Sequence, residues 1–256
     1  MENGGEACPL QSHSSFILLI LFKYFGYNCT LETTTMKIIA HRGARGLAPE
    51  NTIAAIKEGL KHHPDMIEVD VRVTKDGVCI LHHDPKLKDG TPIATTTFKQ
   101  LKTRKPDLAT LDEGIKAVNR KVPMYIEVKP RVPTRQIIKL LRDYLQNGWQ
   151  PKDLWLASFS QRTLRELRQD LPELPVIVNS YFSGVWATWR ARRLGTRYFS
   201  LHHSVLWPGF VRSIAKRGWH LTTYTVNSPA KAKRLAKYGI YAIATDYPDR
   251  FDGKLR

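Results

Sequence analysis

Apolar runs of strand length alternate with helical patterns along this chain from Lys37 onward. This alternation predicts βα units and a parallel sheet, because two parallel strands need a crossover, usually a helix, between them. Eight such runs are present, and eight strands close a TIM (β/α)8 barrel. The predicted strands are residues 37–41, 66–71, 123–128, 154–158, 176–179, 197–201, 220–226 and 242–246.

Predicted helix starts fall between these runs. Asn51 is a predicted cap for a helix with one apolar face, because its side chain can accept a hydrogen bond from a free backbone N–H group. Ser160 is the predicted cap of a later helix. Ser228 followed by Pro229 predicts a third start, since proline suits the first helical position directly after a capping residue.

One apolar run, residues 78–81, follows the second predicted strand too closely for a crossover. The link contains Asp76-Gly77, and Asp-Gly between two β-rich runs predicts a hairpin. With the turn centred near Asp76, paired residue numbers add up to about 152, so His83 falls opposite Val69, between two acids. We therefore expect an α/β TIM barrel with an extra β-hairpin after strand 2 and a short insertion before strand 3.

Four short polar segments stand at the ends of predicted strands. The carboxyl ends of barrel strands meet at one mouth, so these segments should converge. Histidines, carboxylates, an arginine and a lysine in one place suit the binding of a metal ion against a phosphate, with proton transfer beside it. The segments are His41-Arg42-Gly43, Glu68-Val69-Asp70, His82-His83-Asp84 and Glu127-Val128-Lys129.

The acids of the second strand are the first candidates for metal ligands. Alternation along residues 67–72 puts Glu68 and Asp70 on one face and apolar residues on the other. Buried acids are costly unless they are neutralised, and their oxygen atoms suit Mg²⁺ or Ca²⁺. Glu127 repeats the pattern on a later strand and is a candidate third ligand, although it could also form a local pair with Lys129.

The remaining polar residues suit phosphate binding and proton transfer. Arg42 can bind a phosphate through two hydrogen bonds, and Lys129 offers a point charge to a phosphate oxygen. His41 can act as an acid or a base near neutral pH. Of the adjacent pair His82 and His83, the hairpin register favours His83.

The chain is strongly basic, with 40 Lys and Arg against 23 Asp and Glu and a formal charge of +17. Such a surplus attracts phosphorylated small molecules, anionic lipid surfaces and nucleic acids, so the charge alone does not choose among them. Residues 185–194 mix aromatic side chains and arginines at helical spacing. This pattern is typical either of contact with an anionic membrane, which is a candidate peripheral partner, or of a helix packed on the barrel.

The three cysteines, Cys8, Cys29 and Cys79, are too few and too widely spaced for a disulfide framework or a zinc site. Cys79 lies in an apolar run and is a predicted buried residue. This cysteine usage favours a reducing compartment, and we expect a cytoplasmic protein.

Residues 1–35 differ from the rest and form a predicted disordered extension, with one barrel domain over residues 36–256. The apolar run 16–22 is too short to span a membrane, which takes about 20 apolar residues. No Lys or Arg precedes it, unlike a secretory signal. Weak membrane association through residues 16–26 remains an alternative.

Together, the motifs resemble the signature of the glycerophosphodiester phosphodiesterases. The first-half motifs are the most specific, and the resemblance extends from Met36 to about Phe251. They are HRGARGLAPENT (41–52), IEVDVRVTKDG (67–77), HHD (82–84) and IEVK (126–129), followed by SFS (158–160), TVN (225–227) and TDYPD (245–249).

The resemblance implies a TIM-barrel hydrolase that cleaves a small-molecule phosphodiester into sn-glycerol 3-phosphate and an alcohol. It implies that the hydroxyl adjacent to the phosphate attacks first and that water opens the resulting cyclic phosphate. By motif, Glu68, Asp70 and Glu127 would hold one divalent cation, Mg²⁺ or Ca²⁺. His41 and His83 would be the acid and base, and Arg42 and Lys129 would bind phosphate.

Two departures from the family pattern concern the substrate pocket. The insertion between His83 and Glu127 is trimmed, and Tyr224 stands where a tryptophan is common. A shorter lid could admit bulkier diesters, so lysophospholipase D-like hydrolysis of lysolipids is the alternative within this superfamily. A basic nucleic-acid-binding barrel is the alternative of another class, but a pure binder has no need of this acid and histidine set, so no nucleic acid is expected. The sequence does not specify the head group or the oligomeric state.

Overall fold

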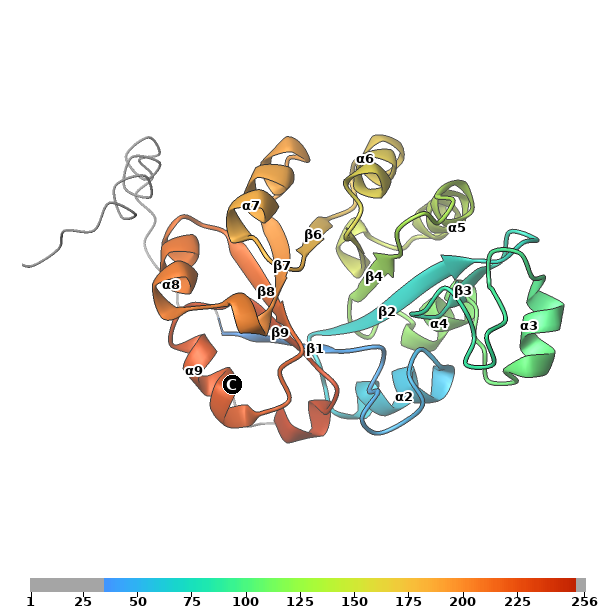
Figure 1. Ribbon diagram of the computed structural model, residues 1–256, viewed down its shortest axis with the longest axis horizontal. Helices are drawn as coiled ribbons and strands as arrows, with labels where there is room; N and C mark the ends of the chain where they lie inside the picture. Colours follow the sequence, from blue (N-terminus) through green and yellow to red (C-terminus); the bar gives the residue numbers. More distant parts are fainter. Residues whose placement is uncertain (1–34, 252–256) are drawn as a thin grey trace, which may run out of the picture. The chain divides into compact units, whose positions relative to one another are not determined.

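The computed structural model describes residues 35–251, which contain nine strands and eight helices (Figure 1). The strands are β1 (Lys37–Ala40), β2 (Met66–Val73), β3 (Cys79–Leu81), β4 (Met124–Val128), β5 (Leu154–Ser158), β6 (Val176–Ser180), β7 (Tyr198–His202), β8 (His220–Tyr224) and β9 (Ala242–Thr245). The helices are α2 (Ile53–Lys61), α3 (Phe98–Arg104), α4 (Leu111–Val118), α5 (Arg135–Gln146), α6 (Gln161–Asp170), α7 (Gly184–Arg193), α8 (Pro208–Lys216) and α9 (Pro229–Ala236).

Eight of the strands form a closed parallel barrel. Their order is β1-β9-β8-β7-β6-β5-β4-β2, and β1 also pairs with β2, which closes the ring. Helices lie around the outside of these strands (Figure 1). All eight strands predicted from the apolar runs are present, and the TIM-barrel prediction is confirmed.

Alternation along each strand separates two hydrophobic layers. Ile67, Val69 and Val71 of β2 belong to the large core between the strands and the helices. A second, smaller cluster of small and large apolar residues, which includes Ile39 and Ala157, fills the interior of the barrel. The inward face of β2 therefore carries Glu68 and Asp70, as the alternation predicted.

The ninth strand confirms the predicted hairpin. β3 pairs with β2 in antiparallel fashion, and Val71, Arg72 and Val73 lie opposite Leu81, Ile80 and Cys79. These pairs have the register predicted from the Asp-Gly turn. The segment after β3 has its own small apolar core, which includes Leu87, Ile93, Leu101 of α3 and Leu108. Cys79 is buried, as predicted.

Two of the three predicted helix caps are confirmed. Ser160 caps α6 and Ser228 caps α9, each accepting a hydrogen bond from a backbone N–H group. The predicted cap Asn51 is wrong, because Thr52 caps α2 by accepting from the Ala55 N–H. The side chain of Asn51 instead contacts Asp70, which is described below.

Two sequence predictions concern residues outside those described. The predicted extension 1–35, apart from Thr35, and the apolar segment 16–26 both lie there, so both stay predictions. Among residues 35–251, every helix is too short or too polar to cross a bilayer.

Candidate active site

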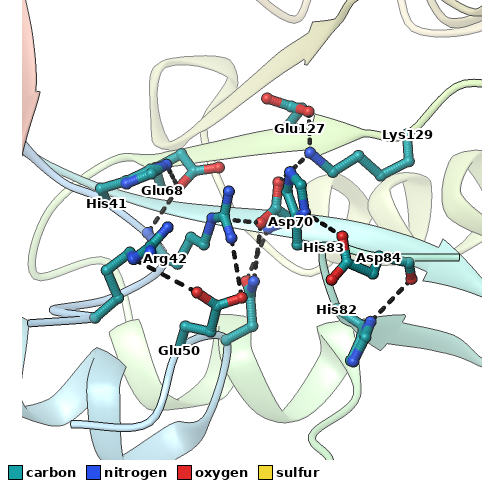
Figure 2. Close-up of polar contacts among 12 residues, drawn as sticks. His41, Arg42, Glu50, Glu68, Asp70, His82, His83, Asp84, Glu127 and Lys129 are labelled. Carbon is teal, nitrogen blue, oxygen red and sulfur yellow. Dashed lines mark hydrogen bonds and ion pairs between the residues drawn. The ribbon is translucent and has the colours of Figure 1, made fainter. Parts of the chain in front are cut away.

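A cavity of about 160 Å³ lies at the carboxyl ends of the barrel strands. This is the end of the barrel where loops following the strands build ligand sites. All seven residues proposed from the sequence line it: His41, Arg42, Glu68, Asp70, His83, Glu127 and Lys129. The fold therefore brings together side chains from β1, β2, β4 and the hairpin (Figure 2).

The turn after β1 is built to bring its backbone against β2. Gly43 has φ +84°, and a Cβ atom there would lie 2.6 Å from the backbone of Ala55. Only glycine fits both the backbone angle and the close approach. Arg42 also has a positive φ, and its N–H donates to Oε2 of Glu68 at 2.6 Å.

Three buried carboxylates form the centre of the site. Oxygen atoms of Glu68, Asp70 and Glu127 all lie within 4.8 Å of one another. Lys129 Nζ lies between two of them, 2.6 Å from Asp70 Oδ1 and in a short hydrogen bond with Glu127 (Figure 2). Arg42 Nε is 3.1 Å from the other oxygen of Asp70. Two cations therefore balance two of the three acids.

Burial and mutual repulsion act on the pKa values of these acids. Burial raises the pKa of Glu68 well above its ordinary value, and the charges of Asp70 and Glu127 raise it further. Burial and Asp70 raise the pKa of Glu127 as well. Burial opposes ionisation of Asp70 too, but attraction to Lys129 and Arg42 outweighs it and lowers its pKa. Glu68 is therefore the least compensated acid.

The donor set fits a hard divalent cation. Three carboxylates that converge from two strands offer only oxygen ligands, which Mg²⁺ and Ca²⁺ prefer. The three carboxylates with Arg42 and Lys129 carry a net charge of −1 when all are ionised. A bound divalent cation would change this net charge to +1, which matches the single negative charge of a phosphodiester. The group could hold a metal ion whose identity the geometry does not specify.

Each of the two proposed catalytic histidines is oriented by an acid. His41 Nδ1 lies 2.7 Å from Asp246 Oδ1, and His83 Nδ1 lies 2.8 Å from Asp84 Oδ1. These contacts leave the Nε2 atom of each ring for a substrate. His41 Nε2 is 4.0 Å from Glu68 Oε2, so it faces the carboxylate centre. Burial lowers the pKa of His83, which favours its neutral form as a proton acceptor.

The neighbouring His82 is placed elsewhere. Its Nδ1 lies 2.9 Å from the carbonyl of Asp84, and its ring points away from the carboxylates (Figure 2). Its backbone N–H donates to the carbonyl of Asp70, so the ladder directs the two adjacent side chains to opposite sides. The preference for His83 over His82 agrees with this geometry.

Several polar residues of the site were not predicted from the sequence as site residues. Asn51 forms two hydrogen bonds with Asp70. The side-chain NH2 of Asn51 donates to Asp70 Oδ2, and the backbone N–H of Asp70 donates to Oδ1 of Asn51. Asn179 donates to Glu127 Oε2 at 2.9 Å and accepts from the Tyr125 hydroxyl. Asp246 forms the hydrogen bond with His41 Nδ1. Asn179 and Asp246 stand at strand ends, which is the signal that could have found them.

One wall of the cavity is aromatic. Phe159 and Tyr181 stack with ring centroids 4.1 Å apart, and Tyr224 meets Phe159 edge-on. Tyr181 is also next to Phe182, at 5.7 Å between ring centroids, and Phe182 is 84% exposed. The aromatic wall of the cavity therefore continues through Tyr181 to the exposed ring of Phe182.

The fold and the site define a TIM-barrel phosphodiesterase, and comparisons with known proteins identify the family. The model of the glycerophosphoryl diester phosphodiesterase family matches residues 41–250. YhdW of Bacillus subtilis (strain 168) is 31% identical over 239 residues, covering 86% of this chain and 98% of that protein. A glycerophosphodiester phosphodiesterase of the same organism is 28% identical over 83% of this chain and 84% of its own length. The chain belongs to the glycerophosphoryl diester phosphodiesterase family and is a phosphoric diester hydrolase.

Solved structures agree with this assignment. A phosphodiesterase from Oleispira antarctica, in complex with the product sn-glycerol-3-phosphate, is 26% identical with a TM-score of 0.76. The match covers 85% of this chain and 95% of that one. A glycerophosphodiester phosphodiesterase from Thermotoga maritima, 21% identical with a TM-score of 0.70 over 87% of this chain and 99% of its own, shares the fold.

Proposed function

We propose that this enzyme hydrolyses glycerophosphodiesters to sn-glycerol 3-phosphate and an alcohol with the help of one divalent cation. The observation that carries the proposal is the convergence of three buried carboxylates with two acid-oriented histidines in one cavity. The Oleispira antarctica relative, which binds sn-glycerol-3-phosphate as product, supports the same reaction.

In this proposal Glu68, Asp70 and Glu127 hold the cation, Mg²⁺ or Ca²⁺. When bound, the cation would polarise a phosphoryl oxygen and stabilise the charge that develops there. Arg42 and Lys129 border the same space and would bind the remaining phosphate oxygens once a cation neutralises the carboxylates that they now contact.

The histidines transfer protons in two steps. The glycerol hydroxyl next to the phosphate attacks phosphorus, one histidine Nε2 accepts its proton, and the other donates a proton to the departing alcohol. A water molecule then opens the cyclic phosphate, and the two rings exchange roles. Asp246 and Asp84 keep Nδ1 protonated in His41 and His83 and thereby present Nε2 to the substrate.

A second candidate is lysophospholipase D-like hydrolysis, and the aromatic wall favours it. Phe159 and Tyr181 offer apolar surface beside the carboxylates, which an acyl chain could occupy. The same catalytic residues would then act on a lysolipid diester.

The test is to identify the products of two substrates. With glycerophosphocholine we expect sn-glycerol 3-phosphate and free choline in equal amounts. Glycerol and phosphocholine would contradict the proposed bond cleavage. Choline release from lysophosphatidylcholine but not from glycerophosphocholine would select the second candidate.

A further inference from the structure

The strongest unexplained feature outside the catalytic cavity is a ridge of exposed aromatic and apolar side chains. It consists of Phe182, Val185, Trp186, Trp189 and Trp207, each between 42% and 84% exposed. A contiguous apolar surface of this kind usually marks an interaction site.

The ridge is continuous across two helices. Trp186 and Trp189 stack on one face of α7, with ring centroids 4.6 Å apart. At the start of α7, Gly184 packs directly on Phe210 of α8, whose ring lies 6.3 Å from that of Trp207. The close packing at Gly184 therefore brings the two parts together into a single surface.

This surface belongs to a part of the chain without acids. From Leu174 to Thr245 the sequence contains no Asp or Glu, but eleven Lys and Arg. Eight of these eleven are exposed, and they lie on or beside α7, α8 and α9. Most of the net charge of +17 is thus concentrated in the sector of the barrel that carries the ridge.

We propose that this ridge docks the enzyme on the surface of an anionic phospholipid bilayer. Tryptophan and other aromatic rings favour the interface between headgroups and acyl chains, and surrounding basic residues attract anionic headgroups. Both components are present in one sector, and that combination distinguishes a membrane from a neutral apolar partner.

The ring contacts of Trp189 make this residue a poor platform for the bases of a nucleic acid. Binding of bases by stacking needs open aromatic faces. Trp189 stacks on Trp186, and the Arg193 guanidinium lies 4.9 Å from the Trp189 ring centroid. Phe182 and Val185, the most exposed members of the ridge, offer apolar bulk suited to insertion among lipid chains.

Docking would place the mouth of the barrel at the bilayer. Phe182 contacts Tyr181, which lines the catalytic cavity. The ridge therefore begins next to the wall of the catalytic cavity. Only this consequence rests on the proposed function; the docking itself does not.

The test uses the full chain and vesicles of phosphatidylglycerol and phosphatidylcholine with brominated acyl chains, which quench tryptophan fluorescence at contact. All six tryptophans lie between residues 149 and 219, so the signal reports the barrel alone and not residues 1–34. We expect brominated anionic vesicles to quench the wild type. Trp186→Phe with Trp189→Phe and Trp207→Phe should remove most of the quenched emission, whereas the control Trp155→Phe should leave the quenched emission unchanged.

A second pair of variants tests affinity. Phe182→Ser with Val185→Ser should weaken vesicle binding in sedimentation about tenfold or more, because inserted apolar area is lost. The control Leu47→Ser changes an exposed apolar residue outside the ridge and should have no effect. Turnover of a small water-soluble diester should be unchanged in both. Absence of quenching, quenching that persists without Trp186, Trp189 and Trp207, or binding of an oligonucleotide in place of vesicles would overturn the proposal.

Discussion

The Nδ1 atom of His41 lies 2.7 Å from Oδ1 of Asp246, so the first and last strands of the barrel together position one of the two proposed catalytic rings. Asp246 is held in turn by Asn227, whose amide donates to its second oxygen at 2.9 Å. Burial opposes ionisation of Asp246, but the hydrogen bonds with His41 and Asn227 lower its pKa. The carboxylate is therefore charged at neutral pH and fixes the ring with Nε2 toward the cavity.

The first prediction concerns this positioning contact. Asp246→Asn should lower kcat by about ten- to a hundredfold, because the carboxylate charge is lost and the new amide NH2 can donate to Nδ1, which favours the other tautomer of the ring. KM should change little, since Asp246 does not line the cavity. Steady-state kinetics would show whether kcat falls while KM stays the same. The control Asp170→Asn, in an exposed pair with Arg142, should behave as wild type, and equal losses in both variants would contradict the assigned role.

The two adjacent histidines give the second prediction. His83→Ala should reduce kcat by about 10²–10⁴, the usual contribution of a general acid or base. His82→Ala should retain near-full activity, because this ring binds the Asp84 carbonyl away from the carboxylates. Measuring kcat of both variants on the same substrate would show which of the two histidines takes part in turnover. A near-active His83→Ala enzyme would show that the ring facing the carboxylates has no part in proton transfer.

The third prediction links metal binding to pH. Burial and neighbouring acids raise the pKa of Glu68, so a proton competes with the metal for this oxygen. As the pH falls through the raised pKa, the apparent affinity for Mg²⁺ should fall and more protons should be released for each ion bound. Calorimetry in buffers of different ionisation enthalpy measures that release. The control Glu68→Gln should bind more weakly with a flatter pH dependence, and pH-independent affinity in the wild type would contradict the prediction.

Gly43 provides the fourth prediction, on stability. Gly43→Ala should lower the free energy of unfolding by about 1–3 kcal/mol more than Gly90→Ala, as expected for overpacking. Both glycines have similar positive φ values, +84° and +87°, but a Cβ at Gly90 meets nothing within 4 Å. The difference between the two variants therefore isolates the clash with the backbone of Ala55. Chemical denaturation measures it, and equal losses would place the cost in the backbone angle alone.

Much of the fold could be predicted because local signals and tertiary structure agree. The Asp76-Gly77 turn specified the register of the β2–β3 hairpin, and the register in turn favoured His83. Alternation along β2 was sufficient to place Glu68 and Asp70 inside the barrel. In each case a residue's neighbours in sequence determine its direction.

Contacts between distant segments could not be predicted in the same way. Asn51 and Thr52 are both good capping residues, and the sequence alone does not show which one caps the helix. In the fold Asn51 has φ +56°, and its side chain turns to Asp70, 19 residues away. Asp246 meets His41 only because the barrel closes between β9 and β1. Such pairs depend on the ring of strands and have no local signature.

The measurement that tests the central claim most directly is release of sn-glycerol 3-phosphate from glycerophosphocholine before and after metal removal. Protein treated with EDTA and dialysed should be inactive, and Mg²⁺ or Ca²⁺ should restore turnover in the wild type. Restoration should fail in Asp70→Asn, which lacks one of the three buried carboxylates, while circular dichroism shows the fold retained. Undiminished release in EDTA, or full activity of Asp70→Asn, would contradict a cation held by Glu68, Asp70 and Glu127.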